Sequence, residues 1–145
     1  MPAPRALSRE ARRILRAASD VIRPRGHGFD HAIDDDVLAG IEAFLPYLPP
    51  PMRLSFPLGL RLLEWSPPVV IRRFVRFSRL PPDEARHYLE RALTLGGPLG
   101  AMVLGVRTLV LLCFYQHPAV LRTLDVDWAG RARELTERRA ALLAE

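Results

Sequence analysis

A long apolar run over residues 96–124 constrains the fold of this chain more than any other feature. The run opens at a Gly-Gly-Pro break, where Pro98 suits the first turn of a helix. Only two residues between Leu99 and Tyr115 are polar, and one of them is Arg107. A helix that is apolar nearly all round must be buried, either in a protein core or in lipid. We therefore predict a buried central helix at about 98–116.

The composition of this run favours a protein core over a membrane span. It holds about 17 residues with an arginine near the middle, whereas a bilayer span needs roughly 20 and tolerates a central charge poorly. We expect the central helix of a soluble domain, with a membrane span as the alternative. His117 and Pro118 then end this helix, and Pro118 suits the start of a short second one.

The length of the chain and the spacing of its apolar residues define the expected fold class. The chain has 145 residues, enough for one domain with its own core. Hydrophobic residues make up 49% of it, which is the composition of a chain that folds. No stretch alternates apolar and polar residues over the length of a strand, whereas helical spacing recurs. We predict an all-α, single-domain bundle of about six to eight helices over residues 1–145, with a frayed N-terminus at 1–7 and a charged final helix at 128–145.

The single cysteine and the distribution of charged residues limit the classes of function that the sequence supports. Cys113 is the single cysteine and lies inside the apolar run, so we expect a buried small hydrophobic residue and no disulfide. All 21 basic side chains are arginine, and they are scattered through every segment beside acidic residues. A nucleic-acid-binding protein usually concentrates its charge on one face. The net charge of +5 therefore does not indicate nucleic-acid binding.

The first two helices carry start signals. Ser8 suits the N-cap of the first helix. The N-cap of the second helix is expected to be one of Asp34, Asp35 or Asp36, because a negative side chain is stabilised at the positive N-terminal end of a helix dipole. The expected apolar face of the first helix holds Ala11, Ile14, Leu15, Ala18 and Ile22, and that of the second holds Val37, Leu38, Ile41, Phe44 and Leu45.

Two more amphipathic helices are expected near the proline-rich joints. A third helix, from about Pro51 to Trp65, would bury one apolar face made of Leu54, Leu58, Leu62 and Trp65. A helix over 69–79 would carry a basic face made of Arg72, Arg73, Arg76 and Arg79. Such a basic helix docks an acidic partner or lies on an anionic membrane, unless it is simply a solvated charged face.

The loop over residues 25–36 contains the strongest metal-binding candidates in the chain. They are His27, Asp30 and His31, because histidine and carboxylate bind zinc or non-haem iron. The two histidines are separated by a glycine-containing loop instead of a helical turn, so we favour a solvated loop whose acids cap a helix over a metal site. No nucleophile elbow, glycine-rich phosphate loop or GxGxxG motif is present. We predict no catalytic residue and no cofactor in this chain.

Three segments together resemble a known family. They are LSREARRILRAASDVIRP with the following His/Asp loop and DDDVL, then RFSRLPPDEARHYLERAL, then LVLLCFYQHPAVLRTLDVD. Across residues 7–127 they are similar to subunit 3 of gluconate 2-dehydrogenase. The pair Phe114-Tyr115 and the pattern Pro118-x-Val120 match that family. Leu121 stands where the family has tryptophan, and Leu124-Asp125-Val126 departs from its Leu-Gly-Tyr.

The resemblance implies an accessory subunit and not an enzyme in its own right. The partner would be a larger flavin-dependent dehydrogenase that holds FAD and acts on an alcohol, sugar or steroid-type substrate. In secreted members the small subunit often carries a twin-arginine export signal. Here Arg12-Arg13 precedes an amphipathic segment that lacks the apolar region of such a signal. We therefore expect a cytoplasmic complex, or a periplasmic one if the chain is exported together with its partner.

The expected partner contacts follow from the basic segment and from exposed aromatic residues. They are Arg72, Arg73, Arg76, Phe77, Tyr115 and Trp128. Arginine interleaved with aromatic residues is typical of protein interfaces, although core packing explains Tyr115 and Trp128 equally well. Two other functions remain open at this stage. One is a membrane-surface protein with peripheral lipid contact, and the other is a small metal-dependent enzyme that uses the loop at 27–36.

Overall fold

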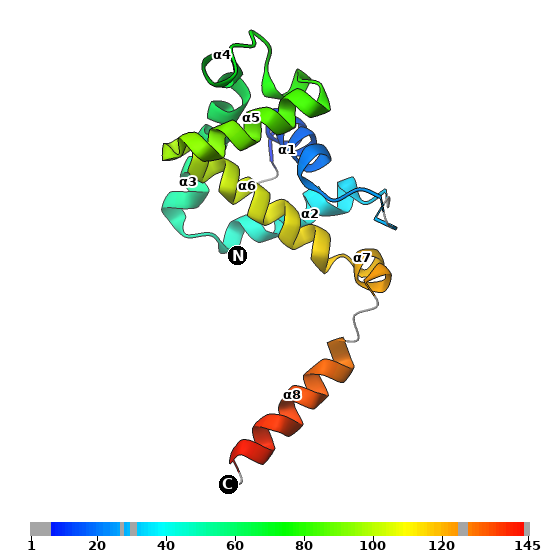
Figure 1. The fold of residues 1–145 in the computed structure, drawn as a ribbon. Coiled ribbons are helices and arrows are strands. Elements are labelled where there is room, and N and C mark those ends of the chain that lie inside the picture. Colours follow the sequence, from blue (N-terminus) through cyan, green and yellow to red (C-terminus); the bar gives the residue numbers. More distant parts are fainter. Residues whose placement is uncertain (1–6, 27, 30–31, 125–127, 144–145) are drawn as a thin grey trace.

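The computed structural model describes residues 7–26, 28–29, 32–124 and 128–143. Within these ranges the chain forms α-helices and two short 3-10 helices and contains no strand, which confirms the all-α class (Figure 1). The elements are α1 (Arg9–Ile22), α2 (Asp34–Phe44), η1 (Leu45–Tyr47), α3 (Pro50–Trp65), α4 (Pro67–Val70), η2 (Phe77–Arg79), α5 (Pro82–Leu95), α6 (Gly97–Gln116), α7 (Pro118–Thr123) and α8 (Trp128–Leu143).

Helix α6 is the centre of the bundle and contacts α1, α2, α3, α5 and α7. Its inner side buries Val103, Val106, Val110 and Phe114. The predicted central helix is confirmed, and its neighbours cover one side of it. On the other side, Leu104 is 57% exposed.

Helix α6 is also the one described helix whose length and apolar composition would allow it to cross a membrane. Only 33% of its apolar window is buried inside the protein. The core helix of a soluble protein meets the same criterion, so this finding is weak support for a membrane span. The packing of four other long helices against its inner side is the arrangement of a core helix.

The turn between α5 and α6 depends on glycine. Gly96 and Gly97 have φ values of +69° and +61°, a region that other L-residues rarely adopt. The turn brings the start of α6 against the end of α5. A Cβ atom placed on Gly100 would lie 3.1 Å from the backbone oxygen of Ala92, so the two helices approach closely at this point.

The predicted start and buried face of α1 are confirmed. The side chain of Ser8 accepts a hydrogen bond from the backbone N–H of Ala11 at 3.1 Å. Ile14, Leu15 and Ala18 are at most 1% exposed.

The predicted cap of α2 is wrong. The helix begins at Asp34, and Ile33 takes the N-cap position without a side-chain hydrogen bond. The three aspartates therefore lie in the first turn, where their charge favours the positive end of the helix dipole. Two of them also contact other parts of the chain: Arg23 forms an ion pair with Asp34 at 3.1 Å, and a ring nitrogen of His117 is hydrogen-bonded to Asp36 at 3.2 Å.

The predicted basic helix over 69–79 is wrong as well. Helix α4 ends at Val70, residues 71–76 are not helical, and η2 follows. The side chain of Glu64 on α3 explains the position of η2. This fully buried carboxylate accepts hydrogen bonds from the Ser78 backbone N–H at 3.0 Å and from the Ser78 hydroxyl at 2.6 Å. Phe77 packs on Tyr88 with a centroid separation of 5.4 Å, so tertiary contacts determine this segment.

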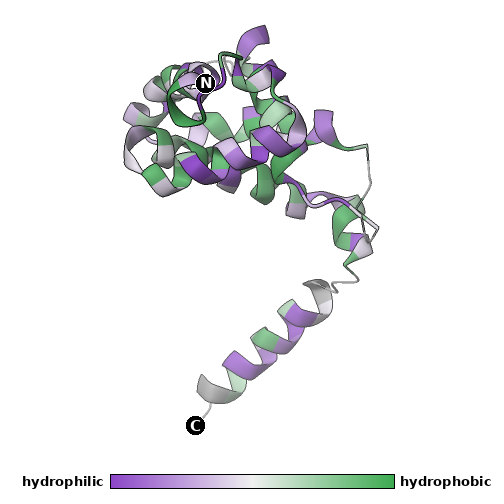
Figure 2. Ribbon diagram, turned by 45° about the horizontal axis from the view of Figure 1, so that its top comes forward, coloured by the Kyte–Doolittle hydropathy of each residue, from purple (hydrophilic) through white to green (hydrophobic). Residues whose placement is uncertain are grey.

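Helix α8 projects away from the other helices in both views (Figures 1 and 2). Hydrophilic and hydrophobic residues are mixed along it (Figure 2). Leu135 in its middle is 64% exposed. The helix is therefore held by its own backbone hydrogen bonds and exposes its described side chains to solvent.

Candidate partner-binding surface

An exposed row of large apolar side chains lies along α3. We call it the α3 stripe, and it consists of Leu54, Leu58, Leu62 and Trp65. These side chains are 76%, 69%, 41% and 56% exposed. The prediction that they are buried is wrong, because α3 instead turns Phe56, Leu60, Leu63 and Glu64 into the core.

The α3 stripe is a continuous ridge. Its members are spaced four, four and three residues apart, which places them on one side of a helix. At 1.5 Å per residue the ridge is roughly 16 Å long. Helix α3 is therefore apolar on two sides, and the fold covers only one of them.

A tryptophan and an arginine meet at the C-terminal end of the stripe. The guanidinium carbon of Arg76 lies 4.2 Å from the centre of the Trp65 ring, which is a cation–π contact. Arg76 comes from the non-helical segment 71–76. Two apolar residues near this end are strongly exposed, Val69 at 86% and Phe74 at 92%.

The arginines near the stripe differ in their pairing. Arg73 is hydrogen-bonded to Glu84 of α5, and Arg61 reaches Glu10 only at 3.9 Å. No ion pair among the described residues involves Arg72 or Arg76. Arg72 also has a φ of +55°, a left-handed backbone that is strained for a residue with a side chain. This end of the stripe therefore carries positive charge that no carboxylate of the described residues neutralises by an ion pair.

The residues expected to contact a partner divide into several groups. Arg72, Arg73 and Arg76 lie in the non-helical segment 71–76, and Arg76 contacts Trp65 at the end of the stripe. Phe77 is only 1% exposed and packs on Tyr88, so the expectation of a partner contact is wrong for this residue. Tyr115 is 42% exposed on α6, and the side chain of Trp128 lies outside the described part of the chain.

The α3 stripe itself was missed as a binding surface by sequence reasoning. Helical spacing shows that its members share a side of α3, but it cannot show which of two apolar sides faces the core. The one available signal was Arg61, a charged residue that lies one turn before Trp65 on the side that was expected to be buried.

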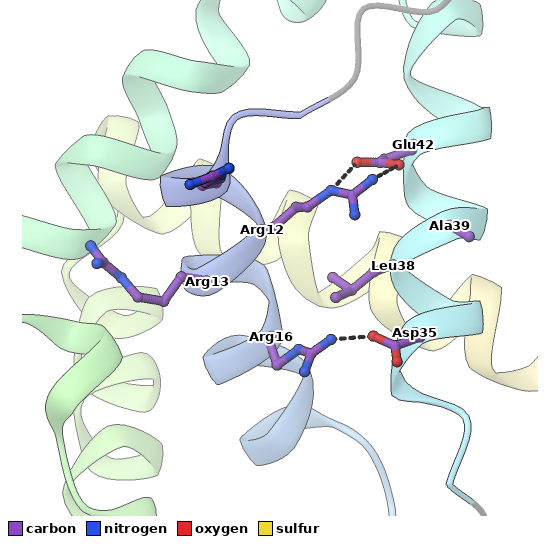
Figure 3. A pocket seen from close by; sticks show the side chains of 8 residues that line it. Arg12, Arg13, Arg16, Asp35, Leu38, Ala39 and Glu42 are labelled. Atoms are coloured by element: carbon purple, nitrogen blue, oxygen red, sulfur yellow. Dashed lines mark hydrogen bonds and ion pairs between the residues drawn. The ribbon is translucent and has the colours of Figure 1, made fainter.

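A groove of about 420 Å³ lies between α1 and α2 and is lined by four arginines (Figure 3). Arg12 donates two hydrogen bonds of 2.7 Å to the carboxylate of Glu42. Arg16 pairs with Asp35 one turn further along (Figure 3). Since these arginines face carboxylates of the same chain, the groove is best described as a charged contact between the two helices.

The metal hypothesis receives no structural support. His27, Asp30 and His31 lie outside the described residues. Among the residues that are described, no group of three histidine, cysteine, aspartate or glutamate side chains could hold a metal ion.

Cys113 is packed between α6 and α2. A Cβ atom on Gly40 would lie 3.1 Å from its sulfur. Burial raises the pKa of the Cys113 thiol, so the nucleophilic thiolate is disfavoured at neutral pH. The side chain therefore acts as a small apolar residue in a close helix contact.

Comparison with known proteins gives no relative: no family model, curated protein or solved structure matches this chain. The described surface is that of an all-α protein with an uncovered apolar ridge and unpaired arginines at one end of it. Its function is inferred below from this surface together with the sequence.

Proposed function

We propose that this chain is a non-catalytic accessory subunit that binds a larger protein through the α3 stripe. The observation that carries the proposal is the exposure of Leu54, Leu58, Leu62 and Trp65 in one row. Soluble monomers rarely leave a contiguous apolar patch with a polar rim uncovered, and such patches mark interaction sites. Tryptophan and arginine are also the residues that most often dominate binding energy at interfaces.

The identity of the proposed partner rests on the sequence resemblance and not on the geometry. Similarity to subunit 3 of gluconate 2-dehydrogenase suggests a flavin-dependent dehydrogenase of alcohols, sugars or steroids as the larger subunit. FAD would be bound by that subunit. The small subunit would cover apolar surface on its partner, in the cytoplasm or, if both are exported together, in the periplasm.

A second candidate function is peripheral attachment to a membrane. It is favoured by Phe74 and Val69, which are almost fully exposed beside Arg76 and Trp65. Tryptophan and arginine are common where proteins meet the lipid headgroup region. This alternative predicts binding to vesicles with anionic lipids that weakens as the salt concentration rises.

Recovering the tagged full chain from an extract of its native cells distinguishes the accessory-subunit function from attachment to a membrane. Bound proteins are identified by mass spectrometry, and bound flavin is measured by its absorbance. The proposal expects one flavoprotein in stoichiometric amount. Recovery of the chain alone, with binding to anionic vesicles, would contradict the proposal and favour the membrane alternative.

A further inference from the structure

We infer that the α3 stripe receives one amphipathic helix of the partner, and that this helix carries carboxylates beside Arg61 and Arg76. The inference rests on the proposed function, because it specifies what binds to the same surface. It adds the secondary structure of the bound segment and the sign of its charge.

The shape of the surface favours a helix as the bound segment. Leu54, Leu58 and Leu62 form a row of the i±4 type, which packs into the groove between the side-chain rows of a second helix. A ridge of roughly 16 Å matches about three turns of such a helix. A peptide that binds as an added strand would instead need the edge of a sheet, and the described residues contain no strand.

The charges around the ridge determine the second property of the partner. Arg76 lies over Trp65, so a helix that covers the indole ring also removes water from this guanidinium. Arg61, whose side chain is 68% exposed, has a carboxylate of its own chain only at 3.9 Å. Arginines that lose water without an anionic partner weaken binding strongly. Carboxylates on the flank of the partner helix would satisfy Arg61 and Arg76.

The same charges favour a protein over a lipid surface. Arg61 lies on the side of α3 that carries the stripe, where a carboxylate can meet it directly. A lipid surface that buried the leucines of the stripe would instead draw the guanidinium of Arg61, whose side chain is 68% exposed, toward the apolar part of the bilayer, where a charge without a partner is costly. We therefore assign the surface to a helix.

Photo-crosslinking in native cells tests the inference directly. The full chain carries p-benzoylphenylalanine in place of Leu58, and a matched chain carries it in place of Leu104 on α6. These two leucines are 69% and 57% exposed. Crosslinked peptides are then identified by mass spectrometry. We expect a crosslink from position 58 to one partner segment with helical apolar spacing and at least two acidic residues on one flank.

A charge-reversal pair completes the test. Arg76→Glu should lower the crosslink yield at position 58 at least tenfold, and replacing the facing acidic residue of the partner by arginine should restore it. A crosslinked segment that is not helical or not acidic would overturn the inference but leave the proposed function standing. A partner that crosslinks only from position 104 would overturn the inference and also the α3 stripe as the binding surface, and would leave only the role of accessory subunit standing. If no protein is crosslinked from either position, or only lipid is, both the inference and the proposed function fail.

Discussion

The guanidinium of Arg76 lies over the indole ring of Trp65, with its central carbon 4.2 Å from the ring centre. Trp65 ends α3, whereas Arg76 belongs to the non-helical segment that follows α4. The contact therefore holds this segment against the end of the α3 stripe. A cation–π pair at an exposed site contributes about 0.5–1 kcal/mol. Its effect on folding is small, and its position beside an uncovered apolar ridge makes it a feature of the binding surface.

Reversing the charge of Arg76 should weaken partner binding more than it weakens the fold. We expect Arg76→Glu to lower the affinity at least tenfold, because it removes the cation beside Trp65 and repels the partner carboxylates. Arg131→Glu on α8 makes the same charge change on an exposed helix and serves as the control. Affinity measured by biolayer interferometry at low salt should fall in the first variant and change less than about twofold in the second. Equal losses would show that only net charge matters.

The buried carboxylate of Glu64 should be important for stability. Glu64→Ala leaves the backbone N–H of Ser78 and the side chain of Arg13 without their carboxylate partner. Removing one member of such a buried set costs about 3 kcal/mol. Urea unfolding followed by circular dichroism should show this loss. Asp35→Ala is the control, because its side chain is 86% exposed and a surface ion pair contributes at most about 1 kcal/mol, so its loss should be well below that of Glu64→Ala.

Two glycines of α6 should respond to alanine in opposite ways. Gly105 has open space where a Cβ would lie, so Gly105→Ala should raise the free energy of unfolding by about 1 kcal/mol through helix propensity. At Gly100 the new methyl group would meet the backbone oxygen of Ala92 at 3.1 Å. Gly100→Ala should therefore lower stability by about 1–2 kcal/mol, because a backbone atom cannot move aside alone. Thermal unfolding of both variants checks this, and a gain at both positions would contradict the close approach of α5 and α6.

The phenol of Tyr88 should make the protein sensitive to alkali. Burial, and then the charge of Glu64, raises the pKa of Tyr88 above its ordinary value of 10.0. The folded state thus favours the protonated phenol. Its contribution to stability is complete below pH 10 and is lost as the pH rises further toward the pKa of the folded state.

Replacing this tyrosine isolates the effect. The Tyr88 hydroxyl donates a hydrogen bond of 2.8 Å to the carbonyl oxygen of Leu63, whose helical donor would be Pro67, a residue without an N–H. Tyr88→Phe should cost about 1–2 kcal/mol at pH 7. The variant should also lose less stability than the wild-type protein between pH 9 and pH 11, as measured by urea unfolding. An identical decline in both proteins would show that another group is responsible.

Sequence reasoning correctly predicted the helices whose apolar spacing allows only one side to be buried. Helix α1 has one apolar side and a serine cap, so spacing and capping chemistry agree on its start and its buried face. Its partner α2 was placed correctly, but its cap was not, because three successive aspartates can each take that role on sequence grounds. The apolar run was assigned to the central helix, although its outer side is uncovered.

Sequence reasoning failed where tertiary contacts decide the structure. Helix α3 is apolar on two sides, and only the positions of its neighbours determine that Leu60 is buried and Leu58 is exposed. The helix predicted over 69–79 has helical spacing, but its first three residues, Val69, Val70 and Ile71, are β-branched and propagate a helix poorly. Burial of Phe77 and the hydrogen bonds from Ser78 to Glu64 hold it in another conformation. No local pattern contains that information.

The most direct test of the binding surface compares two aspartate substitutions in one capture experiment. Leu58→Asp places a charge in the α3 stripe, whereas Leu104→Asp places the same charge on the exposed side of α6. Both side chains are exposed, so both variants should keep the circular dichroism spectrum and stability of a folded chain. The tagged chains are recovered from native extract, and the co-purified flavoprotein is quantified by its absorbance. We predict at least a tenfold loss with Leu58→Asp and less than a twofold loss with Leu104→Asp. Equal recovery with all three chains would contradict the assignment of the α3 stripe as the partner-binding surface.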